Sequence, residues 1–124
     1  MKHMEHVWIM KTDGIVLFHK GSADGFDCDL IAGFLSAVNV IASQIDENGL
    51  KEIELGNRAI AISKVHDLFF IIMHEKKVKT KKIAEKLKQM VAVFFDLYPQ
   101  EKLNAWRGNL STFSQLETAF AVIQ

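Results

Sequence analysis

The alternation of hydrophobic and polar positions begins with two strand-like segments. Residues 6–12 and 15–20 are mainly apolar, and Asp13-Gly14 separates them. This dipeptide favours a two-residue type I′ turn, in which both central residues need positive φ. The opening of the chain therefore predicts a β-hairpin.

Three further strand-like segments follow, at residues 50–55, 58–65 and 68–73. Only short turns separate them, so neighbouring strands are expected to run antiparallel. The last segment is apolar at every position from Leu68 to Met73. Such continuity is typical of a central strand covered on both faces. It predicts helices on each side of the sheet, or one side closed by a partner chain.

Helical periodicity of the apolar residues appears over residues 29–47, 80–98 and 111–123. A short helical turn is expected over 101–106, and Asn48-Gly49 is expected to end the first helix. The residues expected to cap the free N–H groups of these helices are Asp27 or Asp29, Thr80, and Ser111 or Thr112.

The first predicted helix carries one wide apolar face. Its members are Leu30, Ile31, Phe34, Leu35, Val38, Ile41, Ala42 and Ile45. Packing against the sheet accounts for most of this face, and Asn39 is assigned to the polar side. Small residues elsewhere on the helix, including Gly33 and Ala37, permit close approach of another backbone. We therefore expect a protein interface at the margin of the face, with Phe34, Val38 and Ile41 as its candidate residues.

The predicted order of elements is strand, strand, helix, strand, strand, strand, helix, helix. A chain of 124 residues has the size of one ordinary domain. The expected fold is thus one α+β domain over residues 1–124, with a five-stranded antiparallel sheet flanked by helices on both faces. Helix 29–47 is expected on one face, and helices 80–98 and 111–123 on the other.

This order resembles the fold of the longin family, over nearly the whole chain from Val7 to Ile123. The resemblance rests on the opening hairpin, helix 29–47, the three-strand meander over 50–75 and helix 80–98. The related roadblock family usually begins with a helix before its first strand, which favours longin here. Profilin-like and sensor-type domains share parts of the pattern.

The resemblance implies a non-enzymatic module that docks small GTPases, adaptor subunits of vesicle-trafficking complexes, or another longin or roadblock chain. A homodimer is expected if the outer strand of the meander pairs with a second copy. The simple composition also fits a stand-alone archaeal relative. The alternative is a profilin-like domain that senses a small ligand in a pocket between the sheet and residues 21–29.

Charge and composition narrow the class of protein. Fifteen basic residues balance fifteen acidic ones, so the broad positive surface of a general nucleic-acid binder is not expected. The single cysteine, Cys28, cannot form an internal disulfide and fits a reducing cytosol. The first residues do not resemble a signal peptide, and the apolar run Leu68 to Met73 is too short to span a bilayer. We therefore expect a cytoplasmic protein.

No residue pattern predicts a catalytic, cofactor or metal site. The aspartates of residues 21–29 lack the spacing of a calcium loop, and the glycines there do not form a phosphate-binding loop. The five histidines lack zinc-binding spacing, although His19 and His74 would meet if their strands were neighbours. Asp27 and Asp29 flank Cys28, and their negative charge opposes formation of a thiolate.

The densest charged feature is a run of lysines before and within the second long predicted helix. Its members are Lys76, Lys77, Lys79, Lys81 and Lys82. Such a run can contact an acidic partner or, peripherally, an anionic membrane surface. The alternative is a solvated segment that protects a strand edge from aggregation. The run lacks interleaved aromatics and arginines, which argues against nucleic acid.

Overall fold

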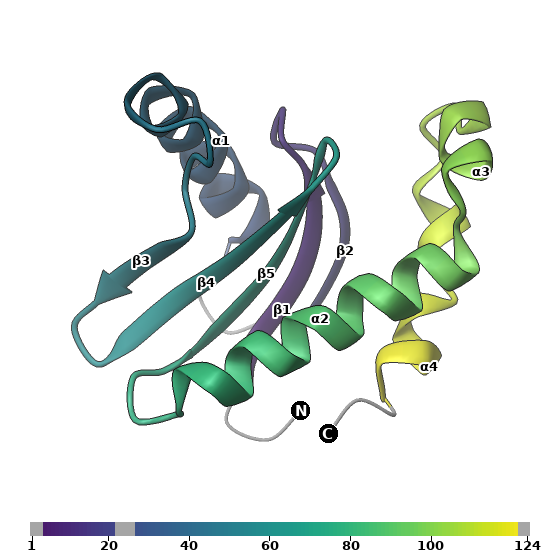
Figure 1. Ribbon diagram of the computed structural model, residues 1–124. Coiled ribbons are helices and arrows are strands. Elements are labelled where there is room, and N and C mark those ends of the chain that lie inside the picture. The colour runs from purple at the N-terminus through teal and green to yellow at the C-terminus, as the bar shows by residue number, and fades with distance from the viewer. Residues whose placement is uncertain (1–3, 22–26, 122–124) are drawn as a thin grey trace.

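The computed structural model describes residues 4–21 and 27–121 (Figure 1). The elements are β1 (Met4–Lys11), β2 (Val16–Gly21), α1 (Cys28–Ile45), β3 (Glu52–Leu55), β4 (Arg58–Val65), β5 (Leu68–Glu75), α2 (Thr80–Leu97), α3 (Gln100–Ala105), a 3₁₀ helix η1 (Leu110–Phe113) and α4 (Leu116–Ala121). The predicted α+β order is confirmed.

The five strands form one sheet in the order β2-β1-β5-β4-β3, and every neighbouring pair is antiparallel. The continuously apolar strand β5 lies in the middle and is buried from Leu68 to His74. Its side chains alternate between two cores, because successive residues of a strand point to opposite faces. Phe70 and Ile72 enter one core, and Phe69 and Ile71 enter the other.

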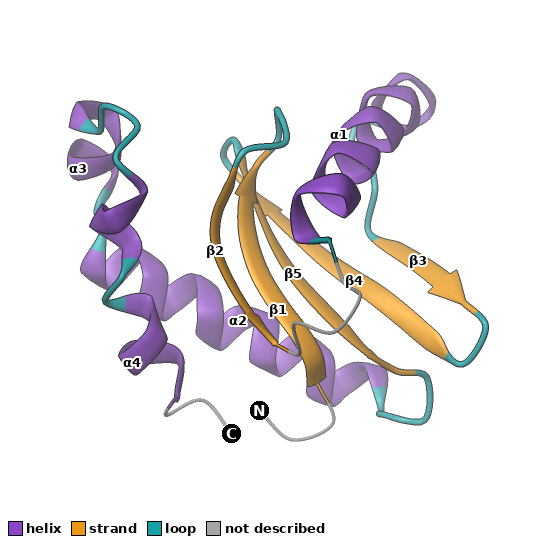
Figure 2. Ribbon diagram, turned by 180° about the vertical axis from the view of Figure 1, so that it is seen from behind, coloured by secondary structure: helices purple, strands orange, loops and turns teal. Residues whose placement is uncertain are grey.

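Helices cover both faces of the sheet, as the sequence predicts (Figures 1 and 2). α1 packs on one face through Ala32 and Leu35, beside Trp8 of β1. α2 and the C-terminal elements pack on the other face, where Phe94, Phe113 and other aromatic residues form the larger core. The sheet is therefore the middle layer of three.

The turn between β1 and β2 differs from the predicted type I′ turn. Gly14 has φ 101°, but among the described residues the only non-glycine residue with positive φ is His66, so Asp13 lacks the required conformation. Gly14 N–H donates to the Lys11 carbonyl at 2.9 Å, and Lys11 N–H donates to the Ile15 carbonyl at 2.8 Å. Gly14 adds one residue to the loop, and the strand register shifts between Ile9 and Met10. The Asp13-Gly14 dipeptide is thus also compatible with a longer hairpin loop, in which only the glycine has positive φ.

The predicted cap of α1 is confirmed at Asp27, whose side chain accepts the Leu30 N–H at 3.0 Å. The predicted stop at Asn48-Gly49 is wrong, because α1 ends at Ile45 and Asp46 is already extended. The Asp46 carboxylate accepts the Asn48 N–H at 2.8 Å, which stabilises a turn before the glycine is reached.

The capping of the later helices also differs from expectation. Lys79 occupies the N-cap of α2 without a side-chain hydrogen bond, and Thr80 is the first helical residue. The predicted helix 111–123 is divided, because Asn109 caps the 3₁₀ helix η1 by accepting the Ser111 N–H at 3.0 Å. α4 then covers only Leu116–Ala121, and Ile123 lies outside the described residues. The expected helical turn near 101–106 is confirmed as α3.

Candidate docking surfaces

The outward side of α1 is apolar. Leu30, Phe34, Ile41 and Ile45 are 69%, 56%, 63% and 84% exposed. They follow one another by four, seven and four residues, so they lie along one side of the helix. We call these four residues the α1 outer face. The expectation that most of the apolar positions of this helix pack in the core is wrong.

The side of α1 that meets the sheet is narrower than predicted. Its buried residues are Ala32, Leu35 and Asn39, and Val38 is only half-buried. Asn39, assigned from sequence to the polar side, is thus part of the covered side. A helix that is apolar on two sides needs cover on both, and the sheet supplies only one. The α1 outer face is therefore an exposed apolar surface within the described part of the chain.

α1 also has the length and composition of a membrane-spanning helix, with 18 residues and a mean hydropathy of 1.5. Polar residues interrupt the apolar positions of this segment, so no long apolar run marks it in the sequence. In the structure, Ala32 and Leu35 pack against the sheet, but most of the helix is not buried. The apolar residues of α1 are thus divided between a side that faces the sheet and an exposed side.

β3, which follows α1 in the sequence, is one of the two edge strands of the sheet. It comes last in the strand order, so its outer edge has no strand partner within the described part of the chain. Ile53 packs against the hydrophobic core between the sheet and α1, whereas Leu55 is half exposed. An open edge offers unpaired N–H and C=O groups to another chain.

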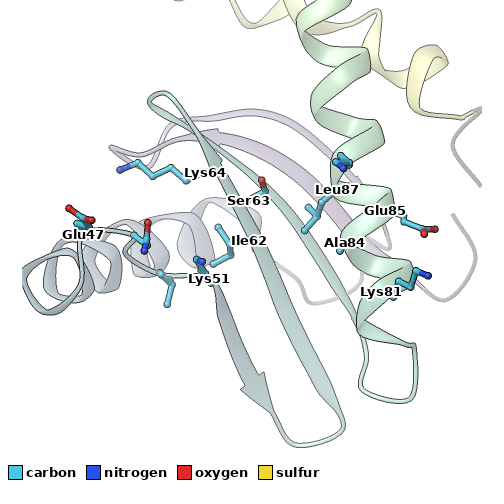
Figure 3. Close-up of a pocket in the computed structure, with 12 residues that line it drawn as sticks. Glu47, Lys51, Ile62, Ser63, Lys64, Lys81, Ala84, Glu85 and Leu87 are labelled. Atoms are coloured by element: carbon cyan, nitrogen blue, oxygen red, sulfur yellow. The ribbon is translucent and has the colours of Figure 1, made fainter.

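A groove of about 670 Å³ lies beside the C-terminal end of β4, which extends past the start of β3 at Glu52 (Figure 3). The connection between α1 and β3 forms one wall, the end of β4 forms the floor, and the first half of α2 forms the other wall. Its lining includes Glu47, Lys51, Ile62, Lys64, Lys81, Ala84, Glu85, Leu87 and Lys88.

The lysines of this groove outside the dense run, Lys51, Lys64 and Lys88, were not predicted. A signal was present in β4, where Ile60 and Ile62 occupy alternate positions and the next such position is Lys64. A charged residue that interrupts an apolar alternation marks the place where one face of a strand meets solvent. Lys51 and Lys88 carry no such local signal.

The predicted interaction residues do not form one surface. Phe34, Val38 and Ile41 lie on α1, whereas the lysine run lies at and before α2, on the opposite face of the sheet (Figure 1). Two members of the run pair with carboxylates, Lys76 with Glu54 at 3.3 Å and Lys77 with Glu75 at 3.4 Å. Lys79, Lys81 and Lys82 are exposed, and Lys81 lines the groove.

His19 meets His6 rather than His74. Nδ1 of His6 lies 3.0 Å from Nε2 of His19, and the two rings stack with centroids 5.3 Å apart. The condition for a contact between His19 and His74 is not met, because β1 separates β2 from β5. Burial is the main cause that lowers the pKa of both His6 and His19. Within the described residues, no three His, Cys, Asp or Glu side chains are arranged to hold a metal ion.

Cys28 is half-buried at the start of α1. Burial, together with the charges of Asp29 and Asp27, raises the pKa of its thiol to about 12. The thiol therefore stays protonated at neutral pH and is a poor nucleophile. The ligand pocket expected near residues 21–29 falls largely on residues 22–26, which lie outside the described part of the chain.

No protein-family model matches the chain, and no curated protein sequence matches it. Solved structures do match. A roadblock/LC7 domain from Streptomyces avermitilis is 14% identical with a TM-score of 0.58, over 75% of this chain and 87% of that one. MglB of Myxococcus xanthus is 13% identical with a TM-score of 0.58, over 75% of this chain and 85% of that one.

A further match is a structure described as MglB with a tetrameric arrangement, 13% identical with a TM-score of 0.50, over 65% of this chain and 67% of that one. At these identities the likeness concerns the fold. The structures named here are roadblock and MglB chains, and the finer preference for longin over roadblock stays a prediction. The order of elements, the antiparallel sheet and these matches together show that the chain has the longin/roadblock type of α+β fold.

Proposed function

We propose that the protein is a non-enzymatic docking module that acts through the α1 outer face and the adjacent edge of β3. The observation that carries the proposal is the apolar side of α1, which the sheet leaves uncovered. The fold supports it, since the resemblance to longin domains implies docking of other proteins. A cytoplasmic location and a part in vesicle traffic belong to the same proposal and rest on that resemblance.

The first occupant that we propose for this surface is a second copy of the chain. A two-fold axis beside α1 would bring Phe34 and Ile41 of one copy against the same residues of the other, and would bring the two β3 edges together. The balanced charge of the chain imposes little net repulsion between copies. A matched MglB structure is described as tetrameric, which supports self-association of this type of fold.

Light scattering over a range of concentrations tests self-association. We expect a dimer for the unmodified protein and a monomer for Phe34→Glu/Ile41→Glu, with an unchanged far-UV circular dichroism spectrum. Ile15→Glu is the matched control, because Ile15 is 47% exposed but lies in the β1–β2 turn. A monomer at every concentration up to ~100 µM, well above the Kd of a stable dimer, would contradict self-association.

The second partner that we propose is a small GTPase, which the longin resemblance implies. Titration of the protein with small GTPases from its source cell, in GDP-bound and GTP-analogue-bound forms, tests this part. We expect binding that depends on the bound nucleotide and no hydrolytic turnover by the chain alone. Turnover by the isolated chain would contradict the non-enzymatic part of the proposal.

Sedimentation with anionic and neutral vesicles separates protein docking from membrane binding. We expect the protein to stay in the supernatant with both kinds of vesicle. Co-sedimentation that is lost in Phe34→Glu/Ile41→Glu would show that the α1 outer face enters a membrane instead.

A further inference from the structure

The last residues of β4 extend beyond β3. The ladder between the two strands runs from Leu55↔Arg58 to Glu52↔Ala61. One more hydrogen bond follows, from the Ile62 N–H to the Lys51 carbonyl at 2.9 Å. β4 continues to Val65 and stays paired with β5 on its other side. The C-terminal end of β4 is thus paired with β5 on one side and has no neighbouring strand from the described residues on the other.

The open edge presents the peptide groups of Lys64. The N–H and C=O groups of successive residues in an antiparallel strand point to alternate sides. Because the Ile62 N–H points toward β3, the N–H and C=O of Lys64 point the same way, into the groove. Among the described residues, no backbone partner of Lys64 is recorded on that side. An incoming strand would find one donor and one acceptor there.

The groove has walls suited to an extended chain. Leu87 and Ala84 of α2 lie on one side of the β4 edge, and the connection that contains Glu47 lies on the other (Figure 3). Neighbouring strands lie about 4.8 Å apart, so an added strand would occupy the space between these walls. Such a segment would contact the backbone of β4 and the apolar side chains of α2 together.

The charge of the groove favours an acidic occupant. Four lysines line it, Lys51, Lys64, Lys81 and Lys88, against two glutamates, Glu47 and Glu85, which leaves an excess of two positive charges. None of the ion pairs recorded among the described residues involves these lysines. The whole chain has no net charge, so this excess is local.

We propose that the open end of β4 binds a short, extended, acidic segment of a partner protein as an additional strand. Backbone hydrogen bonds to Lys64 would hold the segment, and the four lysines would select acidic side chains. This surface is separate from the α1 outer face, so the two can be tested independently. A peptide is favoured over a lipid surface because the available groups are backbone groups at the floor of a groove.

The probe is a capped octapeptide of alternating glutamate and valine, and the control is its lysine–valine counterpart. Both are titrated into ¹⁵N-labelled full-length protein. We expect the glutamate peptide to shift the Lys64 amide resonance and to slow its hydrogen exchange, with weaker binding at high salt. We expect the lysine peptide to leave this resonance unchanged. Equal effects of the two peptides, or an unchanged Lys64 amide at ~5 mM glutamate peptide, would overturn the proposal.

Two kinds of variant distinguish the contribution of the backbone hydrogen bonds to peptide binding from the contribution of the lysine charges. Lys64→Pro removes the outward N–H and leaves the pairing of Ser63 and Val65 with β5, so we expect loss of peptide binding with β4 intact. Lys81→Glu/Lys88→Glu keeps the backbone and should weaken binding about tenfold. Should Lys64→Pro disturb the fold, a glutamate peptide N-methylated at alternate residues tests the same ladder, and undiminished binding of that peptide would overturn it.

One further variant links this test to the proposed function. Ile41→Glu alters the α1 outer face and should leave the binding of the glutamate peptide unchanged. If the unmodified protein binds the glutamate peptide but stays monomeric, the groove is sustained and self-association through the α1 outer face is rejected. Loss of peptide binding in Ile41→Glu would show that the groove depends on the α1 surface, and would overturn their independence.

Discussion

The side-chain oxygen of Asn39 on α1 accepts a hydrogen bond from the backbone N–H of Leu50, 3.2 Å away. Asn39 is buried, and a Cβ on the neighbouring Gly49 would lie 2.7 Å from the same oxygen. Gly49 has φ 66°, which also favours glycine. One polar side chain thus joins α1 to the segment that leads into β3 and forms one wall of the groove.

Asn39→Ala should lower the free energy of unfolding by about 1–3 kcal/mol, because the Leu50 N–H loses its partner. Gly49→Ala should lower it by ~1–3 kcal/mol, through the strained φ and the contact with Asn39. In the double variant the contact is absent, so its loss should be smaller than the sum of the two single losses. Urea unfolding measures all three variants. Additive losses would show that Asn39 and Gly49 do not constrain each other.

The histidine pair should make stability depend on pH. The pKa of His6 and of His19 is lowered in the folded protein, mainly by burial, so the unfolded chain binds more protons just below pH 6.5. Stability should be complete above the unfolded value of about 6.5 and should fall as pH drops toward the folded pKa values. Protonation of both rings would place like charges 3.0 Å apart. Thermal unfolding from pH 7.5 to 5 measures this loss, and an equally steep loss in His19→Gln would contradict its assignment to the pair.

The Cys28 thiol should react slowly in the folded protein. Burial raises its pKa from the ordinary value of 9.0 to about 12, which removes most of the thiolate at pH 8. The higher nucleophilicity of a more basic thiolate offsets part of this effect, which leaves a reaction about 50-fold slower than in urea-unfolded protein. Absorbance with an aromatic disulfide reagent follows both rates. Equal rates would show that the start of α1 opens freely.

The aromatic core beneath α2 should depend strongly on Phe94. Phe94 is fully buried and contacts Phe70, Tyr98 and Phe113. Phe94→Ala should cost about 3–5 kcal/mol, since it removes a large side chain from a packed core. Tyr98→Phe should cost only about 1 kcal/mol, because it removes the hydrogen bond from Tyr98 Oη to the Thr112 carbonyl and keeps the ring. Denaturant unfolding should rank the two variants in this order, and a reversed order would contradict this account of the core.

The elements could be predicted because their signals are local. The Asp13-Gly14 region indicates a hairpin whichever turn type forms, and Leu68 to Met73 indicates a central strand by its continuity. The ends of helices were predicted less well. Asp46 and Asn109 form their own turns with nearby N–H groups, and these turns compete with the expected caps at Gly49 and Ser111.

The candidate surfaces could be predicted only in part. Phe34 and Ile41 were identified as interface candidates and are exposed, but they were expected at the margin of a mostly buried face. The groove lysines were missed because Lys51, Lys64 and Lys88 are far apart in the sequence and meet only through three different elements. A charged residue read by itself does not show which other charges share its surface.

The sequence alone determined the order of strands and helices, the antiparallel sheet and the central place of β5, because periodicity and turn residues act within a few positions of the chain. Only the tertiary structure decided which side of α1 is covered, since Leu35 and Ile41 are equally apolar and differ only in what lies opposite them. It likewise decided that β3 is shorter than β4, which leaves the peptide group of Lys64 near the C-terminal end of β4 without a neighbouring strand on that side in the described part of the chain. Exposure depends on contacts between distant segments, and those contacts exist only once the layers have assembled.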